Sequence, residues 1–184
     1  MSNIKYTMPE LGRMSVSEYR EADKLPLIVV LDNVRSQHNV GAVFRTADAM
    51  RIAGVWLCGI CCCPPNQELH KTALGAEETV DWRYFKDTMD AVRELQEQGY
   101  TVYAVEQAHE SITLEQAAEQ ISNCSKIAVV LGHEVFGVQQ EVIDLCSQCI
   151  EIPQYGTKHS MNVSVTAGIV MYRLASSLRR ETSK

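Results

Sequence analysis

The sequence predicts an α/β fold in which a mostly parallel β-sheet is covered by helices on both faces. Short apolar runs rich in Val and Ile alternate along the chain with segments whose apolar residues have a helical spacing. These runs are apolar throughout rather than at every second position, which is typical of strands buried on both faces. With 184 residues, the chain is long enough to bury a sizeable core within one domain.

The first 25 residues are polar and mixed, and we expect them to form a short extension of a single domain that spans residues 1–184. A helix over residues 15–24 would be capped by Ser15 or Ser17. The N-terminus lacks the basic-then-apolar pattern of a signal peptide, and no apolar run approaches the ~20 residues that cross a bilayer. We therefore expect a soluble cytoplasmic protein with no membrane partner.

The segment after the first strand is expected to be an amphipathic helix with Asn39 as its N-cap. Its apolar residues fall at i, i+3, i+4 and i+7, on one helical face. Arg45 lies about 140° away from the first of them at 100° per residue, well off the apolar stripe. The stripe consists of Val40, Val43, Phe44 and Ala47.

The other predicted elements follow in alternation. The strands share a short apolar run, and they are expected at 27–32, 55–60, 79–85, 100–106, 126–132 and 149–153. The other helices are expected at 68–76, 87–99, 137–146 and 160–180. Asp87 opens the second of these, and Gly99 closes it.

The last predicted helix is apolar all round, which is the pattern of a helix buried on every side. In a chain of this size, the helix would pack on its own sheet and on another subunit. We therefore expect a two-fold symmetric homodimer with this helix at the interface. The alternative is a central core helix in a monomer.

Net charge and cysteine content argue against two classes of site. A net charge of −6 argues mildly against nucleic acid, although a local basic patch on an acidic body can still bind RNA. Seven Cys, three of them adjacent at 61–63, indicate reduced thiols rather than disulfides. Cys146 and Cys149 form a CxxC, but no second regularly spaced pair accompanies them, so no metal is expected.

Three polar, Gly-containing segments follow predicted strands, at 36–41, 132–137 and 154–162. Ligands of parallel sheets bind at the carboxyl ends of strands, so these segments predict one shared pocket for a nucleotide-like ligand. Gly132 would let a ligand approach the backbone closely, unless the glycine serves only a tight turn. A dinucleotide or a nucleoside triphosphate is not indicated, because neither GxGxxG nor GxxxxGK[ST] is present.

These segments carry a resemblance to a known family. DNVRSQHNVGAVFRTADAM (32–50), VVLGHEVFG (129–137) and IPQYGTKHSMNVSVTAGIVMYRL (152–174), with HKTALGAEE (70–78) between them, resemble the motifs of SpoU/TrmH-type 2′-O-ribose methyltransferases of the SPOUT class. The resemblance spans roughly 27–174. It implies a C-terminal deep trefoil knot, which no pattern of composition or periodicity indicates. It also implies a homodimer, in agreement with the last helix.

The resemblance implies candidate site residues in three groups. The catalytic candidates match the polar positions of the motifs and are Asn39, Arg45, Glu134, Ser160 and Asn162. The candidates for binding S-adenosylmethionine are Val105, Gly132, Ile152, Ser160 and Met161. Basic residues that would meet RNA are Arg35, Arg45, Lys158 and His159. Departures from the family pattern occur at His133, Val135, Phe136 and the CCCPP loop at 61–65.

The implied reaction is methyl transfer from S-adenosylmethionine to a ribose 2′-hydroxyl of RNA. We expect Arg45 to grip a phosphate beside the target ribose, because its fork suits a phosphate and its guanidinium stays protonated. The phosphate or water would then accept the proton. The compact chain favours tRNA over rRNA as substrate. The alternatives are base N-methylation, a non-catalytic RNA-binding protein of the same fold, and an α/β enzyme unrelated to RNA.

Overall fold

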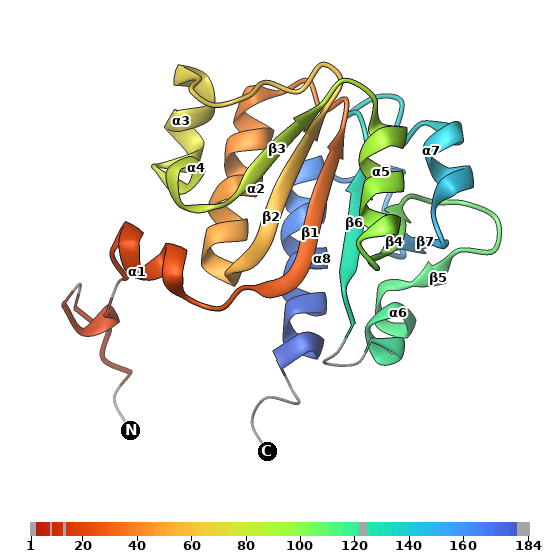
Figure 1. The fold of residues 1–184 in the computed structure, drawn as a ribbon. Helices are drawn as coiled ribbons and strands as arrows, with labels where there is room; N and C mark the ends of the chain where they lie inside the picture. Colours follow the sequence, from red (N-terminus) through yellow and green to blue (C-terminus); the bar gives the residue numbers. More distant parts are fainter. Residues whose placement is uncertain (1–2, 8, 13, 122–124, 180–184) are drawn as a thin grey trace.

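The computed structural model describes residues 3–7, 9–12, 14–121 and 125–179, and its centre is a twisted seven-stranded sheet (Figure 1). All of its pairings are parallel, in the order β3-β2-β1-β6-β4-β7-β5. The strands are β1 Leu25–Asp32, β2 Ile52–Cys58, β3 Trp82–Phe85, β4 Thr101–Val105, β5 Ile112–Thr113, β6 Ile127–Leu131 and β7 Gln148–Glu151. The parallel α/β class predicted from the sequence is therefore confirmed.

Helices cover both faces of the sheet (Figure 1). One face carries α2 Gln37–Met50, α3 Gln67–Ala73, α4 Ala76–Thr79, α6 Leu114–Gln120 and α8 Val163–Arg179. The opposite face carries α5 Thr88–Glu97 and α7 Gln140–Leu145. A 3₁₀ turn, η1 Pro9–Leu11, and the short helix α1 Val16–Glu21 precede the sheet.

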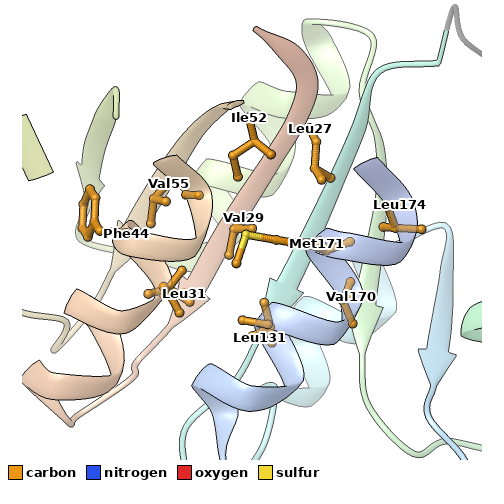
Figure 2. Packing of buried hydrophobic residues seen from close by; sticks show 14 of the residues in the cluster. Leu27, Val29, Leu31, Phe44, Ile52, Val55, Leu131, Val170, Met171 and Leu174 are labelled. Carbon is orange, nitrogen blue, oxygen red and sulfur yellow. The ribbon is translucent and has the colours of Figure 1, made fainter. Parts of the chain in front are cut away.

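The central strand β1 shows why its sequence is apolar at every position. Leu27, Val29 and Leu31 pack into the core cluster beneath α2 and α8, whereas Ile28 and Val30 pack into the cluster beneath α5 and α7. Figure 2 shows the first cluster, in which Met171 of α8 lies beside Val29. The predicted stripe of α2 is buried in the same cluster, because Val40, Val43, Phe44 and Ala47 are all 0% exposed. Burial of this two-sided core fixes the sheet and the helices that carry the site.

Some helix starts agree with the sequence prediction, and three differ. One of these is α7, which begins at Gln140 and not at residue 137. Ser15 caps α1 in a capping box with Glu18, and Asp87 caps α5. The N-cap of α2 is Ser36 rather than Asn39, which lies in the first turn. Likewise, α8 begins at Val163 and not at residue 160. The predicted extension of α8 to Arg180 lies outside the described residues.

Several short elements were not predicted from the sequence. Besides η1 and α4, these are the two-residue strand β5 and the helix α6, which lie between β4 and β6. β5 is too short to give a periodic pattern. α6 is opened by a Thr113–Gln116 capping box, a sequence signal that was available.

The expectation that α8 is buried on every side is wrong for the single chain. Its inner face packs against α2, β1 and α6. Its outer face exposes Val165, Ile169 and Tyr172, which are 53%, 40% and 65% exposed. These residues are spaced at i, i+4 and i+7, so the helix has a second apolar face that nothing in the described part of its own chain covers.

None of the helices in the described ranges is both long and apolar enough to span a membrane.

Candidate functional site

A cleft of about 1060 Å³ opens at the carboxyl edge of the sheet. Its walls are the segments that follow three adjacent strands, β6, β4 and β7. Because these strands are parallel and neighbouring, their carboxyl ends meet at one place. The segment at 36–41 does not line the cleft, contrary to the expectation of one pocket lined by the three polar loops. The segment after β4, at 106–110, lines it instead.

The loop after β6 forms a closed turn at the mouth of the cleft. The His133 N–H donates to the Gly137 carbonyl at 3.0 Å, and the Gly137 N–H donates back to the His133 carbonyl at 2.9 Å. A Cβ atom at Gly132 would lie 2.0 Å from the Gly137 carbonyl carbon. Gly132 is therefore required by the turn itself, and no ligand is needed to explain it.

Glu134 in this turn points to the start of α2 and joins the second motif to the first. Its Oε2 accepts the backbone N–H of Arg35 at 3.0 Å, and its Oε1 accepts that of Ser36 at 2.9 Å. Oε1 also accepts the side-chain N–H of Asn39 at 3.0 Å. The carboxylate thus satisfies N–H groups at a helix start, where the helix dipole also favours negative charge.

These donors decide the charge state of Glu134. Partial burial raises the pKa of its carboxyl, but the hydrogen bonds from backbone N–H groups and from Asn39 outweigh this and hold the pKa below its ordinary value. Glu134 is therefore a carboxylate at neutral pH.

Asn162 joins the third motif to the same network. Its Nδ2 donates to Asn39 Oδ1 at 3.2 Å, and its Oδ1 accepts the Ser164 N–H at 2.9 Å. The Asn162 carbonyl also accepts the Thr166 N–H at 2.9 Å. Asn162 is therefore the N-cap of α8, and one hydrogen-bond chain runs from Glu134 through Asn39 to Asn162.

The base of the cleft loop is held by two carboxylates, and neither of these contacts was predicted from the sequence. Asp32 is fully buried and accepts Gln139 N–H at 3.0 Å, Gln139 Nε2 at 2.8 Å and Thr88 Oγ1 at 2.6 Å. Glu106 accepts the Val138 N–H at 3.1 Å. The sequence offered one indication for Asp32, because it is an acidic residue at the end of an apolar strand. Glu106 follows Val105, which the resemblance assigns to cofactor binding, but its hydrogen bond with Val138, 32 residues away in sequence, was not predicted.

The structure brings most of the sequence-predicted site residues together. All five residues proposed for the cofactor line the cleft, namely Val105, Gly132, Ile152, Ser160 and Met161. Glu134 and His159 also line it. Asn39 and Asn162 do not line it. Asn39 is hydrogen-bonded to Glu134, and Asn162 is linked to Glu134 through Asn39.

The three other candidates, Arg35, Arg45 and Lys158, are exposed and lie outside the cleft lining. Within the described residues, the Arg45 guanidinium makes no hydrogen bond or ion pair, and Asn162 contacts Asn39 rather than Arg45. Arg45 stands six residues beyond Asn39, which is about 9 Å farther along α2. Within one chain, Asn162 therefore does not hold the Arg45 side chain.

The charge of the cleft is one-sided. Four carboxylates line it, and no Lys or Arg does so among the described residues. Apolar side chains and backbone groups supply the rest of the wall. Such a lining suits a ligand that combines a positive charge with an apolar part. The carboxylates are Glu106, Glu110, Glu134 and Glu151.

Cys149 lines the cleft, whereas the other thiols in the described ranges lie outside its lining. Six Cys fall in the described ranges and are free. The Cys61 thiol accepts the Val34 N–H and donates to the Leu31 carbonyl, each at 3.2 Å, and burial raises its pKa to about 12. No cluster of three or more His, Cys, Asp or Glu suited to a metal ion occurs in these ranges, and the absence of a metal stays a prediction.

Residues 26–172 match the model of the SpoU rRNA Methylase family, and the chain belongs to this family. A curated relative, the 23S rRNA (guanosine-2'-O-)-methyltransferase RlmB of Neisseria meningitidis serogroup B, is 34% identical over 149 residues, which cover 79% of this chain and 56% of the relative. The tRNA (guanosine(18)-2'-O)-methyltransferase of Thermus thermophilus is 29% identical over 163 residues, which cover 89% of this chain and 81% of the relative.

Solved structures agree with the family. The TrmH/SpoU tRNA modifying enzyme of A. aeolicus superposes with a TM-score of 0.78 at 26% identity, covering 91% of this chain and 82% of that one. The AdoMet-bound rRNA methyltransferase of Sinorhizobium meliloti superposes with a TM-score of 0.75 at 25% identity, covering 87% and 60%. The chain spans between about half and two thirds of the length of the RlmB relatives that it matches, 56% and 64% for two of them.

Proposed function

We propose that this protein transfers a methyl group from S-adenosylmethionine to a ribose 2′-hydroxyl of RNA. The observation that carries the proposal is the hydrogen-bond chain from Glu134 through Asn39 to Asn162, which joins the three motifs beside one cleft. Family membership supports it, because both curated relatives described above are named as 2′-O-methyltransferases.

The cleft fits the cofactor in charge and shape. S-adenosylmethionine, when bound, supplies a methyl group on a positively charged sulfonium, so it needs no further activation. The four carboxylates of the lining favour a cation. Val105, Ile152 and Met161 supply apolar surface for a flat base, and the cleft volume exceeds what a ligand of this size needs.

The polar network would hold the reacting ribose, and each residue has a part. Glu134 fixes the start of α2, and therefore the amide of Asn39. Ser160 lines the cleft, and its hydroxyl makes no hydrogen bond within the described residues, so it is available to the ribose or to the cofactor carboxylate. Alignment of the hydroxyl with the methyl group is the main contribution that such a site can make.

Arg45 is assigned to the RNA phosphate beside the target ribose, where its fork would bind two oxygens. The phosphate or a water molecule would accept the proton from the hydroxyl. Arg35, Lys158 and His159 are exposed around the cleft and are assigned to RNA. Affinity for RNA should fall as salt rises, in proportion to the phosphates neutralised.

The assembly is proposed to be a homodimer that buries the outer face of α8. Val165, Ile169 and Tyr172 form an apolar stripe that no described part of the single chain covers. A two-fold contact through this stripe would bring two copies of the third motif together. We further propose that the C-terminal segment passes through a loop of the chain, forming the deep trefoil knot, and that residues 1–184 are one domain.

The substrate is proposed to be tRNA rather than rRNA, since the chain matches a larger share of the Thermus tRNA relative than of the RlmB relatives. Base N-methylation and a non-catalytic RNA-binding role stay as the alternatives. A cytoplasmic location, expected from the sequence, also stays a prediction.

The proposal is tested by incubating the protein with S-adenosylmethionine carrying a tritiated methyl group and either bulk tRNA or total rRNA. The product is digested completely to nucleosides and separated. Label in 2′-O-methylated nucleosides is expected. Label in base-methylated nucleosides would support the N-methyltransferase alternative, and no incorporation into either pool would support a non-catalytic protein.

A further inference from the structure

The tip of the closed turn after β6 exposes two large apolar side chains at the mouth of the cleft. Val135 is 73% exposed and Phe136 is 83% exposed, yet both belong to the cleft lining. A single exposed apolar residue is ordinary, but these two are adjacent and stand together on the rim of a cleft, which is a place where a ligand would meet them. The roles proposed above use Glu134 of this turn but leave its tip unexplained.

The Phe136 ring is backed by a second ring and carried on a rigid turn. The centroids of His133 and Phe136 are 4.9 Å apart, and their planes are tilted by 36°. His133 Nδ1 accepts the Val135 N–H at 3.0 Å, and the two hydrogen bonds between His133 and Gly137 close the turn. A preorganised aromatic face loses little entropy when it binds a flat partner.

The neighbours of this ring indicate which flat partner it meets. Glu134, two residues before Phe136, is bonded to the backbone of Arg35, whose side chain is exposed. An exposed aromatic ring and an exposed guanidinium carried on hydrogen-bonded segments suit a base and a phosphate of RNA.

The negative net charge of the chain increases the need for uncharged contacts, such as stacking, in RNA binding. The chain carries a net charge of −6, and no Lys or Arg lines the cleft in the described ranges. Electrostatic attraction of phosphates is therefore weaker than in basic RNA-binding proteins, and affinity must come from other contacts. Stacking of a base on an aromatic face is the contact that depends least on charge.

We infer that Phe136, backed by His133, is the surface on which an unstacked base of the substrate RNA lies while its ribose enters the site. The inference rests on the proposed function and extends it to base recognition. Val135 completes the apolar rim. A base held in this way must be unpaired or turned out of a helix, because stacked and paired bases do not expose a free face.

The test compares Phe136→Ala and Phe136→Trp with the wild type, using whichever of bulk tRNA and total rRNA the wild-type protein methylates. Phe136→Ala should raise KM for that RNA by about 10- to 100-fold, with the dissociation constant of S-adenosylmethionine unchanged. Phe136→Trp keeps an aromatic face, so its KM for the RNA should stay close to that of the wild type. Tyr6→Ala removes another aromatic that is 76% exposed but lies in the N-terminal segment, and it should change neither constant.

A direct reading comes from the fluorescence of the Phe136→Trp protein. Adding the RNA should quench the new tryptophan beyond any change seen from Trp56 and Trp82 in the wild type, because stacking on a base quenches indole emission. Circular dichroism of both variants should match the wild type, since the side chain is exposed.

Three results would overturn the inference while the proposed function stands. These are an unchanged KM for RNA in Phe136→Ala, a weakened affinity for the cofactor instead, or a halved mass in sedimentation, which would make Phe136 a contact between copies. If the wild type methylated neither RNA pool, the proposed function itself would fail, and the inference with it.

Discussion

Glu134 shows how one side chain can connect a cofactor cleft to a helix start. Its carboxylate faces donors only, two from the backbone before α2 and one from Asn39. A carboxylate can accept all of them, whereas an amide of the same shape would turn an NH₂ group toward at least one N–H. Even the substitution Glu134→Gln, which keeps the shape of the side chain, is therefore expected to disturb this network.

Glu134→Gln should lower the free energy of unfolding at neutral pH by about 1 kcal/mol. This is the low end of the cost of leaving a hydrogen-bonding group unsatisfied, because the residue is exposed. The substitution should also slow methyl transfer. The folded-state pKa of Glu134 is depressed, so its stabilising contribution is complete above its ordinary value of 4.5 and is lost as pH falls through the lower folded-state value. The difference in Tm between wild type and variant should therefore shrink below pH 4.5. A difference that stays constant from about pH 7 to about pH 3 would show that the charge is not involved.

Arg45→Ala should reduce kcat by about 100-fold or more, because the phosphate contact acts while the ribose is being aligned. Cofactor affinity, measured by calorimetry, should change little, since Arg45 lies outside the cleft lining. Arg45→Lys keeps the charge but not the fork, and it should recover only part of the rate. Near-normal turnover in Arg45→Ala would refute the assigned role.

Residue types within motifs could be predicted from the sequence, but their partners could not. Glu134, Asn39 and Asn162 were chosen by resemblance, and the structure places them in one hydrogen-bond chain. The hydrogen bonds that hold Asp32 and Glu106 to the cleft loop were not predicted, because the N–H groups that they accept lie 107 and 32 residues away. A carboxylate that serves a distant loop leaves no local pattern.

At the scale of elements, strands and their two-sided burial were the most predictable feature. A continuous apolar run such as that of β1 is typical of a strand that is covered on both faces of a parallel sheet. Helix starts were less predictable, as Asn39 shows. Ser36 and Asn39 are both good cap residues, and the backbone turn that decides between them is set by Glu134, 95 residues later.

Asn162 combines a cap of α8 with a link to Asn39, and two substitutions separate these roles. Asn162→Ala should destabilise the protein by about 1 kcal/mol through loss of the cap. Asn162→Ser keeps a hydroxyl oxygen that can cap the helix but removes the amide donor to Asn39 Oδ1, so its stability in urea should stay near that of the wild type. Both variants should lose methyl transfer. Full turnover in Asn162→Ser would mean that the link is dispensable.

The outer face of α8 belongs to the scale of the whole molecule. From sequence, the helix was expected to be buried all round, and in the single chain its outer stripe is exposed. Periodicity shows that a residue is apolar but not which chain covers it. The proposed homodimer reconciles the two observations, because a second copy would bury what the first leaves open.

Ile169→Glu should therefore produce a monomer, because a charge at the centre of an apolar contact loses its hydration without a partner. Sedimentation at micromolar concentration should give about half the mass of the wild type. Leu74→Glu places the same charge at another exposed apolar residue, at the end of α3, and should leave the mass unchanged. A wild-type protein that sediments as a monomer would remove the dimer proposal.

The arrangement as a whole places one cleft, one polar network and several exposed basic residues at the same edge of a parallel sheet. The class of fold could be read from the alternation of apolar runs and helical patterns. A pocket at the carboxyl ends of the strands could also be predicted, from the polar segments that follow them. The residues that line it were named by resemblance to a family, since the segments that form its walls lie far apart in sequence, from Val105 to Thr166.

The most direct test is a crystal structure of the protein soaked with saturating S-adenosylmethionine. Density for the cofactor is expected between the segments after β4, β6 and β7, in contact with Val105, Ile152 and Met161, with its methyl group directed toward Ser160. Density at another place on the molecule, or an empty cleft at a concentration that saturates binding, would contradict this account.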